Sequence, residues 1–230
     1  MNLNSYSETK ATVVEKAFKL KEQQVKVRIA KFYSFISKIY DLLSSFEWGL
    51  IENKIKPLNP GEKDVILDVG CGTSRVVEWF AKRCKMVYGV DTSKGMVKVA
   101  KRKIFKKNLF HNVELCLADA AHLPFRNECF NLVTVIFTLE ILSQDEAKVA
   151  LKEILRVLRR NGKFLVVSLL NKPCKTLTIY KWLNKMFPTI VNCKPINSKE
   201  LAEKAGFEVK EEHEEPLYNL PVEVVLAIKR

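Results

Sequence analysis

Short apolar runs that alternate with helical stretches, from Asp64 onward, constrain the fold of this chain most strongly. Five runs have the length and β-branched content of strands: DVILDV (64–69), MVYGVD (86–91), NVELCLAD (112–119), FNLVTVIFTL (130–139) and KFLVVSLL (163–170). Apolar residues at helical spacing follow most of these runs. Strands that are apolar on both faces and separated by helices indicate a parallel sheet with helices on both sides. The sequence therefore predicts a doubly wound α/β sheet.

The end of the chain departs from this alternation. SKELAEKAG (198–206) predicts a helix with a glycine stop, and FEVKEEHEE (207–215) and VEVVLAIKR (222–230) predict two strands with no helix between them, which are most simply antiparallel. Between the third and fourth runs only AAHLPFRNEC (120–129) intervenes, so we expect a short or irregular crossover there. Asn161-Gly162 is expected to end the helix that starts at Gln144.

The first 56 residues differ in texture from the rest. They are basic, with an apolar stripe that begins at residues 13–20 and continues in KFYSFISKIYDLLSSFEWGLIENKI (31–55) at helical spacing. Pro57 and Pro60-Gly61 close this section. We therefore expect a helical N-terminal extension over residues 1–56 and one α/β domain over residues 57–230.

Three of the predicted strands end in aspartate, at Asp68, Asp91 and Asp119. Parallel strands end at the same edge of a sheet, where ligands bind, so the three carboxylates should surround one crevice. The tight loop Gly70-Cys71-Gly72-Thr73 lies between them and opens a helix. Glycine allows positive φ and close approach of the backbone to a ligand. The edge of the sheet is thus the expected binding site.

The acidic edge favours a neutral or cationic nucleoside over a dinucleotide. A nicotinamide fingerprint would need a third glycine where the chain has Arg75, and a pyrophosphate would lie poorly beside three carboxylates. Asp91 can accept hydrogen bonds from both hydroxyls of a ribose. Asp91-Thr92-Ser93 would also serve as a helix N-cap, which is an alternative reading of that one aspartate.

Four segments, VILDVGCGT, VYGVDTS, LADAAHLPF and LKEILRVLRRNGKFLVV, resemble in order and spacing the motifs of class I S-adenosylmethionine-dependent methyltransferases. The resemblance spans residues 30–230 and implies a Rossmann-like, seven-stranded sheet with an antiparallel last strand. It also implies S-adenosylmethionine as cofactor. The family often has a small residue such as Gly where this chain has Ser74.

The resemblance assigns cofactor contacts residue by residue. Asp68, Gly70, Cys71 and Gly72 would line the methionine end, and Asp91 would hold the ribose. Thr92 and Met96 would flank the adenosine. Asp119 and Ala120 would contact the adenine, with Asp119 accepting from its exocyclic amine. Phe137 and Thr138 would lie beside the methionine moiety.

Methyl transfer from a sulfonium is an in-line displacement that needs orientation of the acceptor above all. A base is needed only if the acceptor must lose a proton. Candidates are His122, Tyr33, Tyr40 and Glu140, with His122 in the loop after the third strand. Packing is the competing role for each. Cys71 is best read as a small loop residue, because no nucleophilic cysteine is required.

Tyr40 lies in KIYDLLSSF, which resembles the Tyr-Asp segment before the core of ubiquinone and menaquinone biosynthesis methyltransferases. In those enzymes N-terminal helices cover the cofactor, which implies a lid here and a Tyr40 that reaches the methionine carboxylate. The alternative is a core aromatic in a helical stripe. The rest of the quinone enzymes' N-terminal signature is not evident in this chain.

Positive charge is concentrated between Ile154 and Lys199, where the sequence has no Asp or Glu and aromatics interleave with lysines. Such a segment could bind RNA, could lie on an anionic membrane surface to reach a lipid acceptor, or could be a solvated helix face. YKWLNKMF (180–187) would also suit a mobile cover over the acceptor pocket. The formal net charge of the chain is +13.

The remaining composition points to an ordinary globular protein. With 47% apolar residues the chain can build a core, and no apolar run approaches the roughly 20 residues of a membrane span. The N-terminus has no apolar signal region, and the six cysteines show no CxxC pairing. We therefore expect reduced thiols, a cytoplasmic protein and no metal site, because the histidines do not stand at ligand spacing from the cysteines.

Three functions remain open at this point. The first is a methyltransferase that acts on a small or lipid-like acceptor such as a quinone precursor. The second is a tRNA or other RNA methyltransferase that uses the basic 154–199 segment. The third is a non-catalytic module that retains the fold. The sequence gives no oligomeric state.

Overall fold

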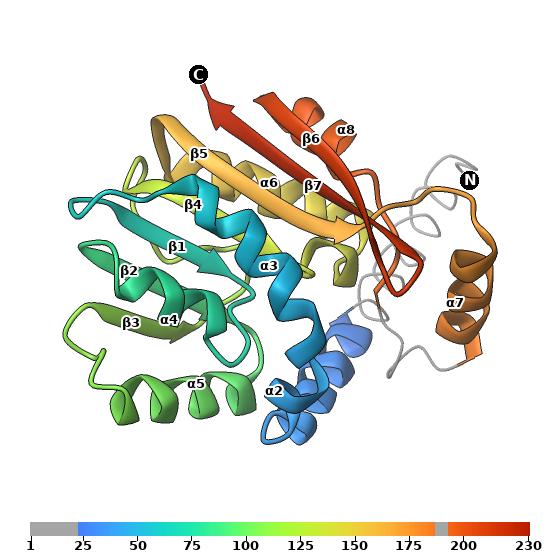
Figure 1. Cartoon of the computed structure of the whole chain (residues 1–230), viewed down its shortest axis with the longest axis horizontal. Coiled ribbons are helices and arrows are strands. Elements are labelled where there is room, and N and C mark those ends of the chain that lie inside the picture. Colours follow the sequence, from blue (N-terminus) through green and yellow to red (C-terminus); the bar gives the residue numbers. More distant parts are fainter. Residues whose placement is uncertain (1–22, 187–192) are drawn as a thin grey trace, which may run out of the picture.

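Seven strands form one sheet in the order β3-β2-β1-β4-β5-β7-β6 (Figure 1). The computed structural model describes residues 23–186 and 193–230, so the stripe expected at residues 13–20 lies outside the described residues. The strands are β1 (Val65–Val69), β2 (Met86–Asp91), β3 (Val113–Leu117), β4 (Phe130–Ile136), β5 (Leu158–Leu169), β6 (Phe207–Leu217) and β7 (Leu220–Lys229).

The pairing of the strands confirms the predicted architecture. β1 pairs in parallel with β2 and β4, β2 with β3, and β4 with β5. β7 runs antiparallel to both β5 and β6. The sheet is therefore mostly parallel with one reversed strand, and the reversed strand is the last in sequence.

Helices cover both faces of this sheet. The main ones are α3 (Trp48–Ile55), α4 (Arg75–Ala81), α5 (Lys94–Lys106), α6 (Gln144–Val157), α7 (Lys175–Met186) and α8 (Ser198–Ala205). Before α3 the chain is helical over residues 23–36 and in α2 (Tyr40–Leu43). None of the described helices is long and apolar enough to cross a bilayer.

Alternate residues of each strand supply two separate apolar cores. On β1, Ile66 packs with one cluster and Leu67 with the other. The first cluster includes residues of α3, α4 and α5, and the second includes residues of α6 and α8. Figure 1 shows α3 and α4 in front of the sheet and α6 behind it. Successive side chains of a strand point to opposite faces of the sheet. Because helices cover both faces here, a strand needs apolar residues at nearly every position.

Helix starts follow local capping chemistry. At α6, the Ser143 hydroxyl accepts from the Glu146 backbone N–H at 3.3 Å, and the Glu146 carboxylate accepts from the Ser143 N–H at 3.0 Å. At α5, the Ser93 hydroxyl accepts from the Met96 N–H. Each cap satisfies backbone donors that the first turn leaves unpaired.

Two connections were predicted with different success. The crossover between β3 and β4 contains no helix over residues 118–129, as expected from its length. The end of α6 was predicted wrongly. The helix stops at Val157, before Asn161-Gly162, because Leu158 already pairs with Phe130 of β4.

Candidate functional site

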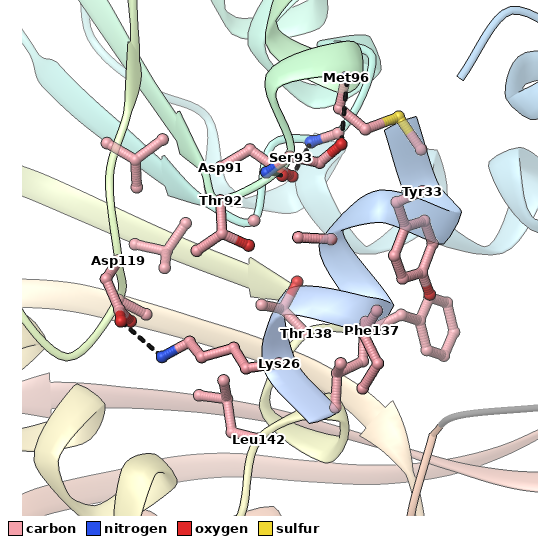
Figure 2. Close-up of a pocket in the computed structure, with 18 of the residues that line it drawn as sticks. Lys26, Tyr33, Asp91, Thr92, Ser93, Met96, Asp119, Phe137, Thr138 and Leu142 are labelled. Atoms are coloured by element: carbon pink, nitrogen blue, oxygen red, sulfur yellow. Dashed lines mark hydrogen bonds and ion pairs between the residues drawn. The ribbon is translucent and has the colours of Figure 1, made fainter. Parts of the chain in front are cut away.

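A pocket of about 330 Å³ opens at the carboxyl ends of β1, β2 and β4, beside the loop after β3. One wall comes from the helix over residues 23–36, as Figure 2 shows. Ten residues implied by the resemblance line it: Tyr40, Gly70, Gly72, Asp91, Thr92, Met96, Asp119, Ala120, Phe137 and Thr138. The fold thus brings together residues that are up to 98 positions apart, from Tyr40 to Thr138.

The loop after β1 needs glycine for two reasons. Gly70 has a φ of 76°, and a Cβ built on it would lie 2.1 Å from the Thr138 hydroxyl oxygen. Gly72 has a φ of 50° but faces more open space. Ser74 holds a φ of 74° in the same loop, which is the conformation that the family's glycine would adopt without strain. The loop therefore brings bare backbone up to the pocket.

Asp91 ends β2 and braces this loop. Its Oδ2 accepts from the Gly72 N–H at 3.0 Å, and its Oδ1 accepts from the Ser93 N–H at 2.7 Å. Burial raises the pKa of this carboxyl, although the two backbone donors favour its charged form. The N-cap of α5 is Ser93 and not Asp91. Asp91 is thus left facing the pocket, with its remaining lone pairs available to a ligand.

Asp119 lies at the other end of the pocket, where Lys26 reaches it from the N-terminal helix (Figure 2). The Lys26 ammonium also contacts the Glu146 carboxylate at 3.0 Å. Burial would raise the pKa of Asp119, but the Lys26 ammonium and the Ala121 N–H outweigh it and hold that pKa below its usual value. The wall formed by residues 23–36 is therefore tied to the sheet edge by an ion pair inside the pocket.

Asp68 and Cys71 do not line this pocket. They line a smaller cavity of about 70 Å³ on the other side of the glycine loop. Asp68 is buried, accepts from the Thr134 hydroxyl at 2.7 Å, and burial raises its pKa to about 7. Cys71 is buried, and burial raises the pKa of its thiol, which agrees with an unreactive loop residue. The six cysteines all lie in the described part of the chain, and none of them forms a disulfide there.

Tyr40 borders both cavities, and Glu47 borders the smaller one. Burial raises the pKa of the Glu47 carboxyl to about 7, against the attraction of the Arg75 guanidinium. Burial also raises the pKa of the Tyr40 hydroxyl, so Tyr40 is a neutral donor at physiological pH. Trp48 and Phe137 contribute apolar surface to the same cavity.

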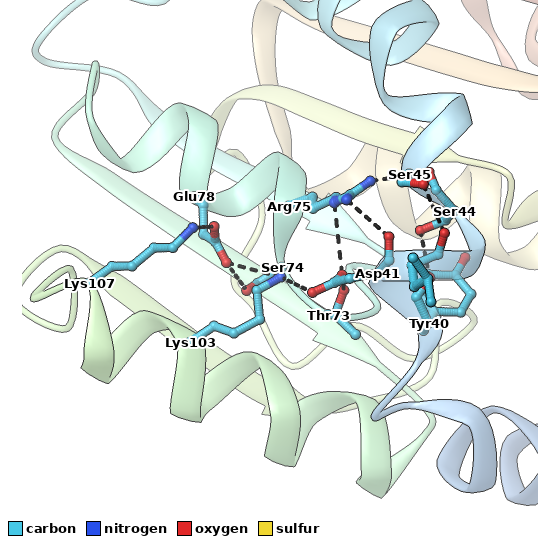
Figure 3. Close-up of polar contacts among 11 residues, drawn as sticks. Tyr40, Asp41, Ser44, Ser45, Thr73, Ser74, Arg75, Glu78, Lys103 and Lys107 are labelled. Atoms are coloured by element: carbon cyan, nitrogen blue, oxygen red, sulfur yellow. Dashed lines mark hydrogen bonds and ion pairs between the residues drawn. The ribbon is translucent and has the colours of Figure 1, made fainter.

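A polar network centred on Asp41 fixes the turn that carries Tyr40 (Figure 3). The Asp41 carboxylate accepts from the Thr73 hydroxyl and from the Lys103 ammonium, the latter at 2.8 Å. The Arg75 guanidinium donates to the carbonyl oxygens of Asp41 at 3.0 Å and of Ser44 at 3.1 Å. Because Thr73 and Arg75 belong to the glycine loop and α4, the turn is held directly against the loop.

A second contact joins the N-terminal helix to α5. The Ser34 hydroxyl accepts from the Gly95 N–H at 3.0 Å and lies 2.9 Å from the Ser93 hydroxyl. A Cβ on Gly95 would lie 2.5 Å from the Ser34 Cα. The two helices therefore approach as closely as they do because residue 95 has no side chain.

The candidate bases are dispersed. His122 is exposed and lines neither cavity, although its backbone N–H bonds the Asp119 carbonyl. Tyr33 lines the large pocket. Glu140 is fully buried, and its Oε1 accepts from the Leu169 N–H at 3.3 Å, so it braces the end of β5. A catalytic role for His122 remains a prediction and forms no part of the proposal below.

Sequence reasoning missed Lys26, Ser93, Glu47, Glu146 and Lys194 as residues that line a cavity. One signal was available for the first. Lys26, Ile29, Ala30 and Tyr33 follow the i, i+3, i+4, i+7 pattern of one helix face, and all of them line the pocket. A lysine at the head of such a stripe indicates an acidic partner. Among the described residues no cluster of three or more His, Cys, Asp or Glu could hold a metal ion.

Comparisons with known proteins agree with this geometry. The model of a methyltransferase domain family matches residues 67–166. A demethylmenaquinone methyltransferase of Lactobacillus johnsonii is 30% identical over 166 residues, which cover 70% of this chain and 66% of that protein. A ubiquinone/menaquinone biosynthesis C-methyltransferase of Cupriavidus pinatubonensis is 28% identical over 65% of this chain and 63% of that protein. The chain thus spans just under two thirds of these relatives.

A solved S-adenosylmethionine-dependent methyltransferase from Aquifex aeolicus has the same fold. Its TM-score is 0.61 at 21% identity, and the match covers 78% of this chain and 89% of that chain. This chain has the reversed last strand that the sequence resemblance implied. The matched methyltransferase domain, the two relatives and the shared fold together support a class I S-adenosylmethionine-dependent methyltransferase.

Proposed function

We propose that this protein transfers a methyl group from S-adenosylmethionine to a small, apolar, quinol-like acceptor. One observation carries the proposal. A single pocket presents Asp91 and Asp119 on one side and apolar side chains of the N-terminal helix on the other. The similarity to a demethylmenaquinone methyltransferase and to a ubiquinone/menaquinone biosynthesis C-methyltransferase supports the choice of acceptor class.

The residues present fit the cofactor. Asp91 would accept from the ribose hydroxyls, and Asp119 would accept from the adenine amine with the lone pairs that Lys26 and Ala121 leave free. Gly72 offers bare backbone: among the described residues, a Cβ built on it would meet no atom nearer than the Tyr40 ring, at 3.9 Å. When bound, the cofactor supplies an electrophilic methyl group on a cationic sulfur. An acidic pocket suits that cation.

The wall formed by residues 23–36 would complete the acceptor side. Val25 and Ile29 line the pocket opposite Ile141 and Leu142. Apolar walls of this kind bind a flat hydrophobic ring and exclude water from the reacting groups. We propose that this helix and the turn at Tyr40 act as a lid, held by Lys26 at one end and by Asp41 at the other.

Glu47 is a candidate proton acceptor for a hydroxylated ring, because Tyr40 and Phe137 border both the large pocket and the smaller cavity that Glu47 lines. It lines the cavity that Tyr40 and Phe137 share, and its pKa of about 7 suits a base at neutral pH. We expect Glu47→Gln to lower kcat about a hundredfold with little change in KM, since a general base contributes roughly that factor or more. Glu62→Gln, on the exposed surface, should leave kcat unchanged.

The pH dependence follows from the same carboxyl. A base works only when deprotonated, so kcat of the wild type should rise with pH through about 7, and the rise should be absent in Glu47→Gln. The raised pKa also makes ionisation of Glu47 unfavourable to the fold. Its contribution to stability is present below the unfolded-state pKa and is lost as pH rises towards 7. If Glu47→Gln keeps the wild-type kcat at every pH, Glu47 is not the base.

The acceptor class is tested with labelled S-adenosylmethionine and the purified protein. Label should enter a reduced short-chain demethylquinone and should not enter bulk RNA or an unreduced quinone. Entry of label into RNA alone would contradict the quinol acceptor and favour the RNA methyltransferase alternative. Tight cofactor binding without transfer to any fraction of a cell extract would point to a non-catalytic module.

A further inference from the structure

Helix α7 carries apolar side chains on two opposite faces. Leu177 is buried, and Tyr180 packs against the apolar cluster that contains β1 and α3. On the other face, Ile179, Trp182 and Met186 are 60%, 59% and 52% exposed. Positions 179, 182 and 186 have the i, i+3, i+7 spacing of one helix stripe, so the three side chains form a continuous apolar strip open to solvent. Packing among residues 23–186 and 193–230 does not account for this strip.

The charged residues of α7 are all positive, as its sequence predicts. Lys175, Lys181 and Lys185 are exposed on α7, and no acidic residue occurs between Ile154 and Lys199. The apolar strip is therefore flanked by exposed cations. Lys181 donates to the Asn171 side-chain oxygen at 2.8 Å, which leaves its charge uncompensated.

The position of α7 relates this surface to the pocket. Figure 1 shows α7 standing away from the sheet at the side of the molecule where β5 and β1 end. The Asn184 amide donates to the Cys193 carbonyl at 3.1 Å, and Lys194, the next residue, lines the large pocket. One face of α7 thus leads by way of residues 193 and 194 to the binding site, while the other is open to solvent.

We propose that α7 is a docking helix that lies on an anionic lipid surface, with Ile179, Trp182 and Met186 entering the interface and Lys175, Lys181 and Lys185 contacting lipid phosphates. Basic helices with a tryptophan-containing apolar strip bind in this way, and tryptophan favours the boundary between headgroups and acyl chains. An RNA partner fits the lysines but not the strip, because Ile179 and Met186 offer no flat ring on which a base could stack.

The inference extends the proposed function without depending on it. A quinol with a long isoprenoid chain resides in a bilayer, so a docking helix beside the pocket would bring the enzyme to such an acceptor. Vesicle binding is measured without cofactor, and methyl transfer to a water-soluble acceptor is measured without vesicles. If vesicle binding fails, methyl transfer can still be interpreted. If methyl transfer fails, vesicle binding can still be interpreted.

The test is co-sedimentation of the full chain with vesicles of phosphatidylcholine alone or with about one third phosphatidylglycerol. We expect binding to the anionic vesicles and weak binding to the neutral ones. Trp182→Ala should weaken anionic binding about tenfold, as expected for loss of a large buried apolar side chain. Replacing any one of the three lysines by Gln should weaken binding to the anionic vesicles about fivefold at low salt.

A matched control is available on α5, which is also rich in lysine. Phe105 is 72% exposed there, and Phe105→Ala should leave vesicle binding unchanged. Equal losses for Phe105→Ala and Trp182→Ala would reduce the contact to non-specific adhesion and overturn the proposal. Weaker binding of Trp182→Ala to RNA, with vesicle binding intact, would overturn it in favour of a nucleic-acid surface.

Fluorescence gives an independent readout. Trp79 is buried and Trp48 packs against the core, so Trp182 is the exposed tryptophan. Anionic vesicles should shift the emission to shorter wavelength, and Trp182→Phe should abolish the shift while retaining most of the binding. An unchanged spectrum in the wild type at saturating vesicle concentration would contradict insertion of α7.

Discussion

Asp91→Ala is expected to weaken binding of S-adenosylmethionine and of its demethylated product about ten- to hundredfold. A hydrogen bond to a charged group contributes about 1.5–3 kcal/mol, and the Asp91 carboxylate would accept from the ribose. The same change leaves the Gly72 and Ser93 N–H groups without their present acceptor, which should loosen the glycine loop and add to the loss. Isothermal titration calorimetry with the demethylated product measures the affinity without turnover.

Two further variants separate binding from folding. Asp91→Asn keeps one acceptor oxygen and the side-chain shape, so its affinity should lie between the wild type and Asp91→Ala. Asp145→Ala removes an exposed aspartate of α6 that pairs with Lys148 at the surface, and it should bind as the wild type does. Wild-type affinity in a folded Asp91→Ala protein would contradict the ribose assignment and with it the orientation of the cofactor.

Gly95→Ala is expected to displace the N-terminal helix without disturbing the sheet. The added methyl group would lie 2.5 Å from the Ser34 Cα and 2.7 Å from the Ser34 carbonyl oxygen, and backbone cannot give way as a side chain does. Alanine favours α5 itself by about 0.5–1 kcal/mol over glycine, so the core should not lose stability. We expect kcat/KM to fall about a hundredfold, since a misplacement of about 1 Å can have that effect.

The control for this variant is Gly49→Ala in α3, where an added Cβ meets no atom within 4 Å. It should retain activity, and its melting temperature should be equal to that of the wild type or a few degrees higher, because alanine favours a helix over glycine. Steady-state kinetics on the small quinol, together with thermal unfolding, distinguish displacement of the lid from global damage. Unchanged kinetics in Gly95→Ala would show that residues 23–36 do not shape the site.

The sheet and its acidic edge could be predicted from the sequence because both depend on local pattern. Strand period, glycine positions and the aspartate after each strand are short-range features, and parallel topology then places Asp91 and Asp119 at one edge. The prediction for Asp68 was less complete. It ends β1 as expected, yet its carboxyl faces the smaller cavity and bonds Thr134 on the neighbouring strand.

The parts that escaped prediction depend on how distant segments dock. The partner of Lys26 is 93 positions away, and the Asp41 network joins a turn, a loop and two helices. The periodicity of the sequence carries no information about such long-range pairings. The end of α6 was misplaced for a related reason, because pairing of Leu158 with β4 overrode the local Asn161-Gly162 signal. Tertiary contacts decided each of these cases.

The division of the pocket between two parts of the chain has an evolutionary consequence. The carboxylates that would bind adenosine belong to the sheet, whereas the apolar wall opposite them belongs to residues 23–36, which meet the sheet through a handful of polar contacts. Substitutions at Val25, Ile29 or Ala30 could therefore allow new acceptors to bind while binding of the methyl donor is unchanged. Diversification of substrate range and preservation of chemistry are separable in such a molecule.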